Sequence, residues 1–236
     1  MQTRIDRTLL QAVEIFSGLE DSALDEVLRV SRGRRLRQGE TVFEQHQEAN
    51  TFYVAVEGRL KVSQVTPEGH QVVVRFIGPR EMLGCVAVCG GGHYPGTATA
   101  VSDSLLIGWT KGVIQYLMER YPKIATNALA TVGGRLQETQ QRVRELSTEK
   151  VERRVAHALT RLAAQAGRRV DGGVQIDFHI SRQDIAEMTG TTLHTVSRTL
   201  SAWEDQGIVE SGRQKVVIRK PHALVAIAED LPAPAG

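Results

Sequence analysis

The chain has 236 residues, and its 29 Lys and Arg against 27 Asp and Glu give a formal net charge of +2. This length allows one or two domains, and a hydrophobic content of 41% is ample for packed cores. Nucleic-acid binding through bulk positive charge is excluded, so a DNA interface must depend on how a few basic residues are arranged. No apolar run approaches the roughly 20 residues of a membrane span and no secretory signal is present, so we expect a cytoplasmic protein without a membrane partner.

The N-terminal half predicts short helices followed by a β-rich domain. Apolar residues recur at helical spacing over residues 8–30. The arginines that follow at positions 29–37 favour a solvated loop and strand edge over a phosphate-binding patch. From Gly39 to Trp109 short apolar runs alternate with glycine-containing turns, a pattern typical of a sandwich or barrel. We expect strands over 51–56, 60–65, 72–77 and 104–109.

Three segments of this β-rich region carry a resemblance to a known fold. They are GETVFEQ from Gly39, FYVAVEGRLKV from Phe52 and FIGPREMLG from Phe76, and they resemble the jelly-roll β-barrel of cyclic-nucleotide-binding domains. In that family a Glu binds the ribose hydroxyl and an Arg neutralises the cyclic phosphate. The resemblance places Cys85 at the Glu position, and residues 90–97 offer His93 but no Arg. Because an uncompensated buried charge is costly, these residues argue against cyclic AMP as the ligand.

Cys85 and His93 are therefore the candidate effector residues of the barrel. No cysteine precedes Cys85, which excludes an all-cysteine iron–sulfur cluster. The spacing of His46, His70 and His93 matches no metal motif, so we predict no metal site; a cupin-like metalloenzyme would also need a compact His-x-His. Thiol redox chemistry at Cys85 and Cys89, a metabolite ligand and a signal-independent scaffold remain alternatives.

A long helix is predicted between the two halves of the chain. From Lys123 to about Leu146 apolar residues fall at steps of three and four, which indicates a heptad seam and a dimerisation helix. The seam consists of Leu129, Val132, Leu136, Val143 and Leu146. Gly133-Gly134 is expected to interrupt this helix, because each Gly costs about 1 kcal/mol relative to Ala. A further amphipathic helix is predicted over residues 151–166.

Residues 180–200 predict two short helices separated by Gly190, which suits a turn with positive φ. Ser181 is a good N-cap for the first helix, and Thr191 or Thr192 for the second. The second helix is expected to bury Leu193, Val196 and Leu200, and to expose Thr192, His194, Thr195, Ser197 and Arg198. Residues 208–219 form two strand-like runs around Ser211-Gly212. Together they predict a winged helix-turn-helix whose second helix enters the DNA major groove.

The segments ISRQDIA from Ile180 and TVSR from Thr195, with the hairpin and the barrel, resemble the Crp/Fnr family of bacterial transcription regulators over residues 10–228. The resemblance implies that Arg198 reads a guanine and that Ser197 and His194 lie on base edges. It also implies contacts with the DNA backbone from Ser181, Arg182, Thr192, Thr195 and, in the wing, Arg213. Many members carry Glu where this chain has His194, which implies a different operator sequence.

The predicted fold class is α+β, with an N-terminal jelly-roll β-barrel (1–111), a long dimerisation helix (112–147) and a C-terminal winged helix-turn-helix (148–236). We expect a homodimeric transcription regulator, an activator and not an enzyme, that binds a palindromic double-stranded DNA operator and RNA polymerase. The segment TTLHTVSRTLSAWE from Thr191 is most similar to the nitric-oxide-responsive, NnrR-like branch that governs denitrification genes. This resemblance implies nitric oxide sensing through haem, with His93 as the first choice of axial ligand.

Overall fold

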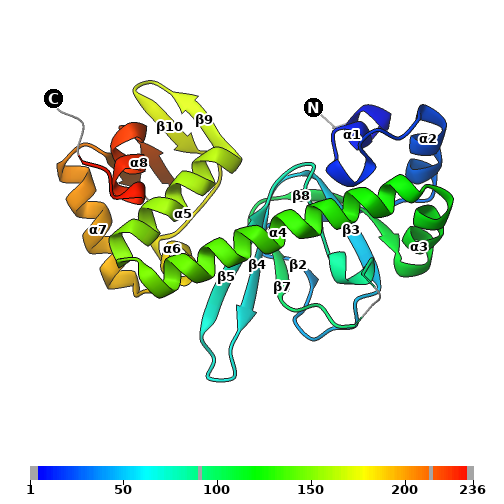
Figure 1. The fold of residues 1–236 in the computed structure, drawn as a ribbon, viewed down its shortest axis with the longest axis horizontal. Helices are drawn as coiled ribbons and strands as arrows, with labels where there is room; N and C mark the ends of the chain where they lie inside the picture. The colour runs from blue at the N-terminus through cyan, green and yellow to red at the C-terminus, as the bar shows by residue number, and fades with distance from the viewer. Residues whose placement is uncertain (1–4, 90–91, 213–214, 233–236) are drawn as a thin grey trace. The chain divides into compact units, whose positions relative to one another are not determined.

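The computed structural model describes residues 5–89, 92–212 and 215–232. The chain forms two compact units, and the boundary between them along the chain falls within helix α4, between Thr139 and Gln140. Figure 1 labels the elements. The helices are α1 (Arg7–Gln11), η1 (Glu14–Phe16), α2 (Asp21–Arg29), η2 (Cys85–Ala87), α3 (Lys111–Arg120), α4 (Pro122–Thr148), α5 (Val151–Ala166), α6 (Arg182–Thr189), α7 (Leu193–Asp205) and α8 (Pro221–Glu229).

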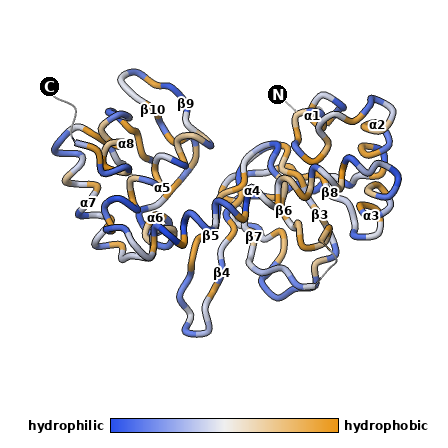
Figure 2. Tube along the Cα trace, viewed as in Figure 1, coloured by the Kyte–Doolittle hydropathy of each residue, from blue (hydrophilic) through white to orange (hydrophobic). Residues whose placement is uncertain are grey.

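Strands of the N-terminal unit form two four-stranded antiparallel sheets, in the orders β1-β8-β3-β6 and β2-β7-β4-β5. Their bounds are β1 (Arg32–Leu36), β2 (Thr41–Phe43), β3 (Thr51–Glu57), β4 (Leu60–Val65), β5 (Gln71–Ile77), β6 (Met82–Leu83), β7 (Thr97–Ala100) and β8 (Ser104–Thr110). Strands β3 and β8 are hydrophobic along most of their length (Figure 2). The predicted barrel is thereby confirmed, and the arginine-rich segment after α2 forms its edge strand β1.

The core of this unit joins the sheets to the N-terminal helices. Trp109 at the end of β8 packs edge-on against Phe16, with ring centroids 5.1 Å apart. Its indole N–H donates to the carbonyl oxygen of Val27 at 2.8 Å, so the buried ring has its polar atom satisfied. Ile124 and Ala128 of α4 are buried in the same cluster, which anchors the start of the long helix.

Helix α4 is continuous from Pro122 to Thr148, so the expected interruption at Gly133-Gly134 is wrong. Helix propagation is cooperative, and a helix of 27 residues absorbs a cost of about 1 kcal/mol per glycine. The predicted seam is apolar and exposed within the single chain. Its exposed members are Leu129, Leu136, Val143 and Leu146, with fractional exposures of 74%, 58%, 58% and 49%.

The C-terminal unit combines the end of α4 and helices α5 to α8 with a four-stranded sheet of order β11-β12-β10-β9. Its strands are β9 (Gly167–Val170), β10 (Gly173–Ile176), β11 (Val209–Gly212) and β12 (Lys215–Ile218). Helix α5 spans Val151–Ala166, as predicted, and Gly167 begins β9. Ser211 and Gly212 were expected to turn, but they pair with Val216 and Lys215 and extend β11. None of the helices in the described ranges has the length and hydropathy needed to cross a bilayer.

Candidate functional site

Both helices of the helix-turn-helix are capped at their N-termini by hydrogen bonds between residues three positions apart. The Ser181 hydroxyl accepts from the backbone N–H of Asp184 at 3.0 Å, and the Asp184 carboxylate accepts from the N–H of Ser181 at 3.0 Å. This is a full capping box in which Asp replaces the usual Glu or Gln. Gly190 ends α6 with φ of +60°, in the left-handed region that favours glycine. The Thr192 hydroxyl accepts from the N–H of Thr195 at 3.2 Å and caps α7.

One face of α7 is buried and the other carries the polar residues predicted for DNA. Val196, Leu200 and Trp203 are almost fully buried, which holds the helix against its unit. His194 and Arg198 are exposed, and Thr195 and Ser197 are half-buried between them. Leu193 was expected in the core but is 48% exposed, because it is the first residue of α7 and precedes the buried face.

Arg182 lies in a network that joins α6, α7 and the wing strand β11. Its Nη2 donates to the Ser211 hydroxyl at 2.8 Å and lies 3.8 Å from the Glu204 carboxylate. Glu204 in turn accepts from the N–H of Ser211 at 2.8 Å and from its hydroxyl. The sequence patterns did not indicate Glu204, because its partners come from separate elements. Arg213, predicted to contact the DNA backbone, lies outside the described residues.

Cys85 lies on η2 and lines a cavity of about 150 Å³ in the barrel. The cavity is lined mainly by apolar side chains, among them Phe43, Val62, Ile77, Leu83, Val86 and Tyr94. Arg75 of β5 and Arg135 of α4 also line it. Residues 90–97 carry no arginine, but the folded pocket has two. Both cations come from elements outside the segment that the family resemblance compared.

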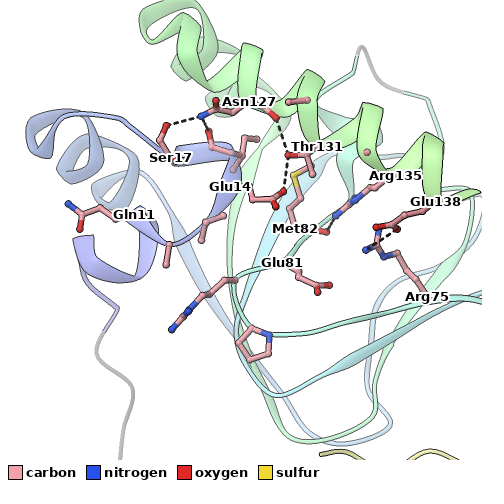
Figure 3. A pocket seen from close by; sticks show the side chains of 17 residues that line it. Gln11, Glu14, Ser17, Arg75, Glu81, Met82, Asn127, Thr131, Arg135 and Glu138 are labelled. Atoms are coloured by element: carbon pink, nitrogen blue, oxygen red, sulfur yellow. Dashed lines mark hydrogen bonds and ion pairs between the residues drawn. The ribbon is translucent and has the colours of Figure 1, made fainter. Parts of the chain in front are cut away.

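The two arginines also face a wider groove of about 750 Å³, which continues along α4 to residues 11–17 (Figure 3). Arg135 donates from Nη1 to the Cys85 sulfur at 2.7 Å and from Nη2 to the Met82 carbonyl oxygen at 2.6 Å. Arg75 Nη2 lies 3.9 Å from the Glu138 carboxylate, and its Nε is buried without a hydrogen-bond partner. This part of the pocket thus carries two guanidinium groups.

These surroundings shift two ionisable groups. Burial raises the pKa of the Cys85 thiol, and the neighbouring Arg135 opposes this shift. Burial, followed by the charge of Arg135, lowers the pKa of Arg75. The sulfur is therefore an uncharged thiol at neutral pH and does not neutralise the guanidinium beside it.

The described residues do not fit haem. The His93 side chain is exposed, and its backbone forms an isolated β-bridge with Glu48. Within the described ranges no three His, Cys, Asp or Glu side chains gather to hold a metal ion. The cavity beside Cys85, about 150 Å³, is also too small to enclose a group as large as haem.

Comparison with known proteins matches both units. Residues 33–121 match the model of the cyclic nucleotide-binding domain, and residues 153–227 match the Crp-like helix-turn-helix domain. The chain is 29% identical over 214 residues to the cyclic AMP receptor protein of Thermus thermophilus, covering 91% of this chain and 96% of that protein. It is 27% identical to the transcriptional activator protein FnrA of Stutzerimonas stutzeri, covering 87% and 83%. The structure of FixK2 from Bradyrhizobium japonicum shares the fold with a TM-score of 0.73 at 24% identity, covering 88% and 100%.

Proposed function

Because the chain belongs to the Crp/Fnr family of DNA-binding transcription regulators, we propose that it acts as a homodimer on a palindromic operator. The observation that carries this proposal is α7, with a polar face of His194, Ser197 and Arg198 opposite a buried apolar face. A helix presented in this way can enter the major groove. RNA polymerase is the protein partner we propose for the complex.

The proposed dimer forms through the exposed seam of α4. Four large apolar side chains exposed along one helix are unusual for a monomer, and their spacing suits a two-stranded coiled coil. A two-fold dimer places two α7 helices on successive major grooves, about one helical turn apart.

We assign Arg198 to a guanine edge and His194 and Ser197 to neighbouring base edges. Arg198 is exposed, and a guanidinium can donate to both acceptors of guanine. Thr192, Thr195 and Ser181 are assigned to phosphates, although the first two hydroxyls also bond each other at 2.9 Å. Arg182 is 36% exposed and is assigned to a phosphate while Ser211 and Glu204 orient it.

Arg198→Ala tests the central assignment. Affinity for the matched operator should fall about ten- to a hundredfold, while affinity for a duplex changed at the contacted guanine should fall little. Fluorescence anisotropy with both duplexes measures this. The matched control is Arg169→Ala, which removes an equal charge from exposed strand β9 of the same unit. Equal losses on both duplexes would show that Arg198 contacts only phosphate.

The signal that the barrel receives is a separate question. The sequence predicts nitric oxide, sensed through haem. The NnrR-like resemblance of the DNA-binding segment supports it, whereas the pocket geometry does not. Anaerobic titration with one equivalent of haem, followed by nitric oxide, tests it by absorption spectroscopy. A saturable Soret band that shifts with nitric oxide would support haem sensing. A broad band that does not saturate would contradict it.

A further inference from the structure

We propose that the barrel binds a small aromatic carboxylate, with its ring in the cavity beside Cys85 and its carboxylate on Arg75 and Arg135. The inference rests on the proposed function in one respect, because it names the chemical class of the signal that a regulator of this family would receive. The site differs from the one expected from the family resemblance, since its cations come from β5 and α4.

Two positive charges lie at this site, on Arg75 and Arg135. The positive charge of Arg135, after burial, lowers the pKa of Arg75, so the two guanidinium groups lie close to each other. The Glu138 carboxylate lies 3.9 Å from Arg75 and is 63% exposed, and the charge of Glu81 also acts on Arg75. Arg135 bonds only to the Met82 carbonyl oxygen and the Cys85 sulfur in the described structure, both uncharged acceptors at neutral pH. In the described structure Arg135 thus makes its hydrogen bonds to uncharged acceptors at the mouth of an apolar cavity, where an anion beside its guanidinium is favoured.

Both guanidinium groups have N–H donors available for a ligand. The Nε of Arg75 is buried without an acceptor, and Arg135 uses only part of its guanidinium in its two hydrogen bonds. A carboxylate accepts from guanidinium groups in a planar, two-pronged geometry that a halide does not match. The donors therefore favour a carboxylate or a similar planar oxyanion.

The cavity has a size and lining that suit one aromatic ring. Its volume of about 150 Å³ is that of apolar cavities known to hold one benzene ring. Phe43 and Tyr94 stack with centroids 3.8 Å apart and form part of its wall. Aromatic and aliphatic walls next to two cations fit a ligand with one ring and one negative charge.

Calorimetric titration of the full chain with benzoate tests the proposal through a ligand series. We expect saturable binding of one benzoate per chain. Benzamide keeps the ring but lacks the charge, and acetate keeps the charge but lacks the ring, so each should bind at least about tenfold more weakly. The larger 2-naphthoate should also bind more weakly. Absence of saturable benzoate binding, or equal binding of benzoate with benzamide or acetate, would overturn the proposal.

Variants locate the site. Arg135→Gln and Arg75→Gln should each raise the Kd for benzoate about tenfold or more, because each removes a charged donor. Arg144→Gln on the exposed surface of the same helix α4 is the matched control and should leave the Kd unchanged. An unchanged Kd in both pocket variants would place the ligand elsewhere and overturn the assignment. The ligand series with the unaltered chain decides the question if a variant fails to fold.

Parallel measurements distinguish failure of the ligand inference from failure of the proposed DNA-binding function. Operator binding by the unaltered chain is measured in parallel without benzoate. Intact operator binding without benzoate binding overturns only the ligand inference, whereas benzoate binding without operator binding overturns the proposed function.

Discussion

The DNA-binding helices and the barrel pocket use polar side chains whose partners lie at very different distances along the chain. Ser181 and Thr192 each bond a backbone group three residues away. Arg135 bonds Cys85, 50 residues away, and Met82, 53 residues away. Short-range caps depend on a local helix end, whereas the pocket requires a strand, a 3₁₀ turn and a helix to pack correctly first. Substitutions on the exposed face of α7 should therefore change DNA affinity without changing stability, and substitutions in the pocket should change both.

The largest expected effect comes from the helix that contributes to both units. Leu136→Arg places a charge in the exposed apolar seam and should convert a dimer into a monomer. Because two linked recognition helices bind far more tightly than one, operator affinity should fall about a hundredfold or more. Analytical ultracentrifugation and anisotropy measure the two changes. A variant that stays dimeric with unchanged affinity would place the dimer interface away from this seam.

The next largest effect is on the free energy of unfolding, and it distinguishes the barrel pocket from the DNA-binding helices. Arg135→Ala removes two hydrogen bonds of a half-buried guanidinium, so the free energy of unfolding should fall by about 1–2 kcal/mol. The loss is limited because repulsion from Arg75 is relieved at the same time. Thermal melting should show a Tm decrease of roughly 2–8 °C, against no change for Arg198→Ala. An equal Tm for the two variants would contradict the claim that pocket substitutions, unlike those on the exposed face of α7, lower stability.

A smaller effect is expected from Glu204, which joins α7 to the wing strand β11. Glu204→Ala leaves the N–H and hydroxyl of Ser211 without their acceptor and loosens the wing strand from α7. Affinity should fall about three- to tenfold, equally for matched and mismatched duplexes, since the wing contacts backbone. A loss that appears at a single base position would instead give Glu204 a role in base recognition.

The smallest effect concerns the glycines of α4. A Cβ added at Gly133 would meet no atom within 4 Å of this chain. Gly133→Ala should therefore raise the free energy of unfolding by about 0.5–1 kcal/mol and the Tm by roughly 1–4 °C. A lower Tm would show that the partner helix of the dimer approaches the backbone closely at this position.

Much of the DNA-binding region was predictable because its determinants are local. The caps Ser181 and Thr192, the positive φ of Gly190 and the buried Val196 and Leu200 all follow from helical spacing. The error at Leu193 is a boundary error, because periodicity does not show how far the core extends along a helix. The continuous α4 was mispredicted because an intrinsic glycine penalty is small beside the packing and cooperativity of a long helix.

The sequence by itself determined the α+β architecture, the winged helix-turn-helix and the polar face of α7, since these depend on periodicity, capping residues and turn chemistry. Only the tertiary structure decided the charge of the barrel pocket. Arg75 and Arg135 are 60 positions apart in β5 and α4, and the cavity that they line exists only once these elements pack. A local sequence pattern cannot encode that proximity, because the electrostatics of a pocket depends on distances between side chains in space.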